Sequence, residues 1–127
     1  KNYDYFKFVD FLTPNKHEAE FILGKKIDGN ELKAASELKK YGPKHVIITL
    51  GSEGLVYSGD FEKFFKPIKT DSIDPVGSGD CFNGALASMI NKGENILNSI
   101  NFAQKAAALS TTKKGASQSF PFLNEIE

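Results

Sequence analysis

The sequence predicts an α/β layered fold, and two observations carry that prediction. The first is the order of its local patterns, which runs strand, helix, helix, strand up to residue 50. The second is the run His45–Leu50, which is almost continuously apolar, as expected for a strand buried on both faces of a largely parallel sheet. We therefore expect one compact unit with a mostly parallel sheet.

The first half of the chain divides into short elements separated by Gly, Pro and Asn breaks. We expect a strand over 7–12, a short helix from Asn15 to about Leu23, a helix over 31–41, a strand over 45–50, and a small antiparallel hairpin of strands 55–57 and 62–65. Aromatic and β-branched residues favour the first strand, which ends where Pro14 restricts the backbone. His45, at the entrance of its strand, is expected to be structural.

Two helices are predicted in the second half. Apolar residues recur at i, i+3, i+4, i+7 and i+8 from Phe82, which predicts an amphipathic helix from Asp80 to about Lys92. A second helix is expected from Asn95 to about Thr111. The lone cysteine, Cys81, is expected to be a small buried packing residue rather than a nucleophile.

The loop before the first of these helices is the strongest candidate for chemistry. Gly77 and Gly79 flank Ser78, and their unpaired N–H groups at a helix start could hold phosphate oxygens or a developing anion. Asp80 follows directly and could accept a proton from a substrate hydroxyl. The alternative is that Asp80 is only a helix cap and the glycines only a tight turn.

A second candidate is the pair Asn15 and Glu18, which are three residues apart on the first turn of a helix. They could face a metal–phosphate site, or Asn15 could be an N-cap with Glu18 completing a capping box. The local sequence does not separate these alternatives.

Composition excludes several classes of protein. The formal net charge is zero and no run of apolar residues is long enough to span a membrane, so we expect neither a nucleic-acid partner nor a membrane partner. All basic residues are Lys, so phosphate contacts must come from Lys, backbone N–H groups or metal. A single cysteine fits a reducing, cytoplasmic location. The chain starts at Lys1 and its only Met is Met89, which favours a fragment of a longer product.

Together these motifs resemble the ribokinase-like carbohydrate kinases, also called the phosphofructokinase B family. The loop 74–80 is similar to the family's Asp-Thr-x-Gly-Ala-Gly-Asp signature, and 13–18 resembles its Asn-x-x-Glu motif. The turn 49–54 resembles its nucleotide-side turn, and 102–121 is similar to the ribokinase branch. The resemblance implies a layered α/β/α sandwich, of which residues 1–127 would be the C-terminal part of one domain, without the N-terminal sugar-binding half and lid.

The resemblance also implies roles for individual residues. Asp80 would be the general base that contacts the sugar, and Gly77, Ser78 and Gly79 would form the anion hole. Residues of the ATP site would be Asn15, Thr49, Gly51, Ser52, Gly54, Gly79 and Gln104. Glu18 would hold Mg²⁺ through water. A monovalent cation, K⁺, would bind at Asp74, Val76, Ser110, Lys113, Gly115 and Ser119.

The implied activity is transfer of the γ-phosphate of ATP to a sugar hydroxymethyl group, with D-ribose, giving ribose 5-phosphate, as the first choice of substrate. Pro75 stands where the family signature has Thr, and such a loop also resembles the kinases of fructose and tagatose phosphates. A phosphosugar kinase, a nucleoside kinase and a non-catalytic nucleotide-binding module are therefore alternatives. A homodimer is expected for the full-length protein, and the isolated fragment is expected to be inactive.

Overall fold

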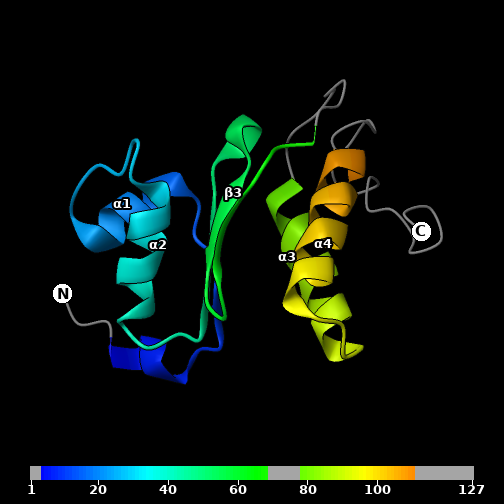
Figure 1. Cartoon of the computed structure of the whole chain (residues 1–127), viewed down its shortest axis with the longest axis horizontal. Helices are drawn as coiled ribbons and strands as arrows, with labels where there is room; N and C mark the ends of the chain where they lie inside the picture. Colours follow the sequence, from blue (N-terminus) through cyan, green and yellow to red (C-terminus); the bar gives the residue numbers. More distant parts are fainter. Residues whose placement is uncertain (1–3, 69–77, 111–127) are drawn as a thin grey trace. The chain divides into compact units, whose positions relative to one another are not determined.

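The structure is a computed structural model that describes residues 4–68 and 78–110. The chain divides into two compact units, Lys1–Pro67 and Ile68–Glu127. The first unit contains a sheet and two α-helices, and the second contains a pair of helices (Figure 1).

The sheet of the first unit has four strands in the order β1-β2-β3-β4. Their bounds are Phe11–Leu12 for β1, His45–Thr49 for β2, Leu55–Ser58 for β3 and Glu62–Phe65 for β4. β1 is parallel to β2, whereas β3 is antiparallel to both of its neighbours. The α/β class is confirmed, but the sheet of the described residues is mixed rather than mostly parallel, because the predicted hairpin supplies β3 and β4.

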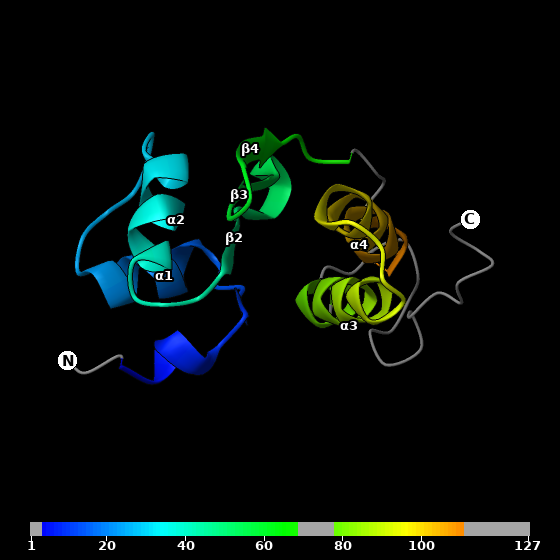
Figure 2. The same ribbon diagram turned by 60° about the horizontal axis from the view of Figure 1, so that its bottom comes forward.

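Helices α1 (Lys16–Leu23) and α2 (Glu31–Lys39) lie on the same side of this sheet (Figures 1 and 2). They bury small and apolar residues against one face of the central strands. The core formed in this way contains Ala19, Ile27, Ala34, Ala35 and Leu38 from the helices and their connection, and Val46, Ile48 and Val56 from the strands. The predicted bounds of both helices are confirmed to within about two residues.

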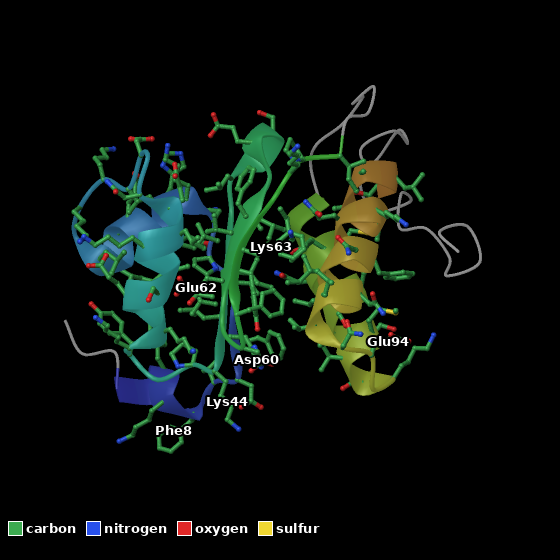
Figure 3. All side chains as sticks on the ribbon, in the orientation of Figure 1. Phe8, Lys44, Asp60, Glu62, Lys63 and Glu94 are labelled. Carbon is green, nitrogen blue, oxygen red and sulfur yellow. The ribbon has the colours of Figure 1, made fainter. Side chains whose placement is uncertain are left out.

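The first predicted strand is mostly wrong. Residues Asp4–Phe8 form a 3₁₀-helix, η1, and only Phe11–Leu12 pair in the sheet. The reason is tertiary, because the backbone of Lys7 passes so close to Gly42 that a Cβ atom there would lie 2.3 Å from the Lys7 Cα atom. Phe8, at the end of η1, points away from the unit, with 81% of its surface exposed (Figure 3).

The second unit is built on helices α3 (Ser78–Asn91) and α4 (Ile96–Ser110), which pack against each other. Gly93 lies just after α3, in the connection to α4, and has a φ of 87°. A glycine in this conformation ends the helix, as the sequence predicts. The predicted apolar faces meet in this pair, and the buried residues include Phe82, Leu86, Ile100 and Ala103. Both predicted helices are confirmed.

Within residues 4–68 and 78–110, no helix is both long enough and apolar enough to cross a membrane.

Candidate nucleotide and catalytic site

The start of α1 is fixed by a complete capping box. The side-chain Oδ1 of Asn15 accepts a hydrogen bond from the backbone N–H of Glu18 at 2.8 Å, and Oε1 of Glu18 accepts one from the N–H of Asn15 at 2.8 Å. Both residues are exposed. The box uses one carboxylate oxygen of Glu18, so the second oxygen keeps its capacity to accept a hydrogen bond or hold a hydrated cation. The structural alternative for this pair is confirmed, and it leaves room for the functional one.

The end of β2 lies beside this capped helix start. Asn15 and Thr49 form an isolated parallel bridge, and the N–H of Thr49 donates to the carbonyl of Pro14 at 3.0 Å. Because β1 and β2 are parallel, their carboxyl ends meet at one edge of the sheet, which is the usual place for ligands in open α/β sheets. The structure thus brings Thr49 beside the pair Asn15 and Glu18, which belongs to a separate sequence motif.

The turn that follows β2 depends on two glycines with positive φ. Gly51 begins a 3₁₀-turn, η2 (Gly51–Glu53), with φ 61°, and Gly54 follows it with φ 101°. A Cβ atom on Gly54 would lie 2.2 Å from the carbonyl oxygen of Phe65, so the close approach of β4 requires a glycine. Gly51 and Ser52 are exposed at the same edge of the sheet, where their backbone is accessible to a ligand.

One charged residue of this edge was missed by the sequence analysis. Lys16, the first residue of α1, forms an ion pair with Asp28 in the connection to α2. The hydrogen bond to Asp28 raises the pKa of Lys16, and the same bond lowers the pKa of Asp28. Lys16 could have been found from the sequence, because it directly follows the N-cap Asn15 in a chain that has no arginine for contacts with phosphate.

In the second unit, Gly79 and Asp80 occupy the first turn of α3 and are exposed. The first N–H groups of a helix lack partners within the helix and carry positive partial charge, so an anion close to this turn is stabilised. A carboxylate at this position is accessible to a substrate hydroxyl. Gln104, predicted to face adenine, is half-buried on α4.

Cys81 and Ser110 pack where the start of α3 meets the end of α4. The thiol of Cys81 donates to the carbonyl of Ala106 at 3.4 Å, and burial raises its pKa. Ser110 is buried, and its hydroxyl donates to the carbonyl of Ala107 at 2.7 Å. Cys81 is therefore a packing residue, as predicted. The hydroxyl hydrogen of Ser110 is engaged within its own helix, and the structure adds no support for Ser110 as a cation ligand.

Several predicted site residues lie outside the described residues. These are Asp74, Val76, Gly77, Lys113, Gly115 and Ser119. The backbone of Ser78 is described as the first residue of α3. The anion hole and the monovalent-cation site therefore stay predictions.

An open hollow of about 380 Å³ lies elsewhere on the first unit. Its lining residues are His17, Glu20, Phe21, Lys25 and Lys26. None of these is a predicted site residue, so the hollow gives no support to the sequence-based assignment.

The chain is similar to known carbohydrate kinases in both sequence and fold. The model of the pfkB family carbohydrate kinases matches residues 3–123. The fold is an α/β fold of the kind found in ribokinases, as the solved structures below show. The chain therefore belongs to the pfkB family of carbohydrate kinases.

Individual relatives agree with this assignment. The ribokinase of Lactococcus lactis is 39% identical over 121 residues, which cover 94% of this chain and 38% of that protein. The crystal structure of ribokinase from Thermotoga maritima has a TM-score of 0.84 at 36% identity, over 95% of this chain and 42% of that one. Arabidopsis thaliana ribokinase, solved with ribose and ATP, has a TM-score of 0.86 at 27% identity, over 95% of this chain and 40% of that one. The chain thus spans about two fifths of the length of these relatives.

Proposed function

We propose that the protein carrying this chain is an ATP-dependent sugar kinase that transfers the γ-phosphate of ATP to the hydroxymethyl group of D-ribose. The observation that carries the proposal is the match to the carbohydrate kinase family over residues 3–123, with Asp80 exposed in the first turn of α3. Ribose is preferred because ribokinases are 34–39% identical to the chain.

Asp80 is proposed to be the general base. Its carboxylate accepts the proton of the attacking hydroxyl as the oxygen–phosphorus bond forms and the bond to the leaving ADP oxygen breaks. The helix start stabilises negative charge that develops on the transferred phosphoryl group, because the unpaired N–H groups of Gly79 and its neighbours carry positive partial charge. Phosphoryl transfer depends mainly on such positioning and charge stabilisation.

Asn15 and Glu18 are proposed to hold the phosphate side of the nucleotide together with Mg²⁺. The residues fit this ion, because Mg²⁺ in kinases is usually bound by one or two carboxylates and substrate phosphates, and keeps several waters. The capping box leaves one carboxylate oxygen of Glu18 for a water of the hydrated ion. The ion, when bound, would neutralise phosphate charge.

The remaining assignments extend the same proposal. Thr49, Gly51, Ser52 and Gly54 are proposed to line the nucleotide pocket, with Gln104 facing the adenine. We further propose that the chain is the C-terminal part of the kinase domain. The sugar pocket and lid would come from the N-terminal half, K⁺ would bind beside the anion hole, and the complete protein would be a cytoplasmic homodimer. These finer assignments rest on the sequence resemblance.

The proposal can be tested by measuring ADP release from the complete gene product with Mg²⁺ and ATP. The acceptors would be D-ribose, fructose, fructose 6-phosphate, tagatose 6-phosphate and a nucleoside, each with and without K⁺. Ribose-dependent ADP release is the expected result, and Asp80→Asn should remove it. Preference for another acceptor would correct the substrate. ATP binding without turnover on any acceptor would favour a non-catalytic nucleotide-binding module.

A further inference from the structure

The ion pair of Lys16 lies at the proposed phosphate side of the site. Lys16 directly follows Asn15, and its partner Asp28 belongs to the connection between α1 and α2. The side chain of Lys16 is 29% exposed and that of Asp28 is 67% exposed, so the pair is accessible from solvent. A ligand at this edge of the sheet could therefore reach the ammonium group.

Helix stability does not explain a lysine at this position. A cation in the first turn opposes the helix dipole, which favours acidic residues there. An ion pair between exposed side chains also contributes little to stability, because water and salt screen it. We therefore look for a role of Lys16 in what this edge binds.

The charges around Lys16 indicate what that role is. Asp28, Glu20 and Glu53 are the carboxylates that act on the ammonium group, and Glu18 lies within the same helical turn. Without a cation beside them, these carboxylates would repel the phosphates of a nucleoside triphosphate. This chain contains no arginine, so a phosphate-binding guanidinium cannot come from these 127 residues, and Lys16 is the cation that directly follows Asn15.

We propose that Lys16 binds the phosphates of the nucleotide and that Asp28 holds its ammonium group in place until the nucleotide arrives. On binding, the ammonium group exchanges the Asp28 carboxylate for a phosphate oxygen. Asp28 is then a competitor of the nucleotide for Lys16. This inference rests on the proposed function, because it deepens the description of the ATP site.

Competition and simple structural support predict opposite effects for the loss of Asp28. Under competition, Asp28→Asn frees the lysine and tightens nucleotide binding. Under structural support, the same change loosens the connection and weakens binding. The asparagine is nearly the same size as the aspartate, so the change removes the charge with little effect on packing.

The experiment is calorimetric titration of the complete protein with Mg²⁺ and a non-hydrolysable ATP analogue. Lys16→Met should weaken binding roughly ten- to hundredfold, the usual range for a hydrogen bond between charged groups. Asp28→Asn should tighten it about two- to fivefold, as expected for release of an exposed ion pair. The double variant should bind like Lys16→Met alone, because Asp28 acts only through the lysine.

A matched control is Lys25→Met, which breaks the exposed Lys25–Glu37 ion pair of the same unit at 2.9 Å. It should leave the affinity unchanged. Weaker binding by Asp28→Asn, or equal binding by Lys16→Met and the unaltered protein, would overturn the inference while leaving the kinase proposal in place. Failure of the unaltered protein to bind the analogue at all would overturn the proposed function and this inference with it.

Discussion

The two units hold their candidate functional residues in different ways. In the first unit the residues at the edge of the sheet also build the structure, since Asn15 and Glu18 cap α1 and Gly54 gives β4 room to pass. In the second unit Asp80 is an exposed residue in the first turn of a helix whose packing depends on Phe82, Leu86 and their neighbours. If the proposed site is correct, we expect binding and folding to be coupled in the first unit and chemistry and folding to be separable in the second.

This difference has a consequence for reading variants. We expect a substitution at the sheet edge to change both stability and nucleotide affinity, so an activity measurement alone would not reveal which of the two was lost. We expect a substitution of the exposed Asp80 to change the chemical step with little effect on stability. Stability and activity therefore have to be measured on the same variants.

The largest expected effect is that of Asp80→Asn on turnover. Loss of a general base should lower kcat about 10²–10⁴-fold. Because Asp80 is exposed, the free energy of unfolding should change by at most about 1 kcal/mol, mainly from its interaction with the helix dipole. Steady-state kinetics and urea denaturation of the same preparation would check this. A large loss of stability would contradict the separation described for the second unit.

Gly54→Ala should cost more stability than any other change at the sheet edge. Its φ of 101° and the 2.2 Å approach to the Phe65 carbonyl require backbone movement, with a cost of about 2–4 kcal/mol. Gly51→Ala is the control, because its φ is 61° and nothing lies within 4 Å of the added atom. That change should cost only about 1–2 kcal/mol, the usual strain of a left-handed residue. Equal shifts of the urea midpoint would argue against the packing explanation.

Two substitutions of Asn15 can distinguish its role as a helix cap from its proposed role in nucleotide binding. Asn15→Ala removes the acceptor for the Glu18 N–H and should cost about 1 kcal/mol. Asn15→Asp keeps that acceptor and should preserve stability, but its negative charge should raise the KM for ATP. Thermal unfolding and ATP titration of both variants test this. If the aspartate variant bound ATP normally, Asn15 would be a helix cap alone.

The smallest effect is expected at His45, the first residue of β2, at the opposite end of the strand from the candidate site. The Tyr57 hydroxyl accepts from the Asp60 N–H at 3.0 Å and lies 2.7 Å from Nδ1 of His45, a distance at which it can donate to the neutral tautomer that carries its hydrogen on Nε2. Burial lowers the pKa of His45 below its usual 6.5.

The folded state therefore disfavours the charged form of His45. The stability that this neutral histidine contributes is complete above its usual pKa of 6.5 and is lost as the pH falls through the lowered value. The thermal midpoint of the unaltered protein should decrease as the pH is lowered from about 7.5 to about 5.5. The midpoint of His45→Asn, which keeps an acceptor near Nδ1, should decrease less steeply over the same range. The control is His17→Asn, which removes an imidazole with a 91% exposed side chain. Identical slopes for all three proteins would rule out His45 as the source.

Much of the candidate site follows from local sequence. The capping box joins residues three apart, and the turn after β2 needs glycines at two nearby positions, so both can be recognised without the rest of the chain. The period of the apolar residues likewise predicts α3 and α4, and the break at Gly59 between two short strands predicts the hairpin of β3 and β4. These features form through bonds between near neighbours, and their patterns stay visible in the sequence.

Other features are decided by contacts between distant residues. The close passage of Lys7 by Gly42 replaces a predicted strand by η1, and the bridge between Asn15 and Thr49 joins two motifs into one edge of the sheet. The pairing of Lys16 with Asp28 crosses from a helix to a loop. Local propensity does not specify these contacts, because they depend on how the backbone of one segment packs against another. The sequence by itself thus determined the helices, the hairpin and most of the candidate residues, whereas the tertiary structure decided the form of the first segment, the partner of Lys16 and which of the motifs meet.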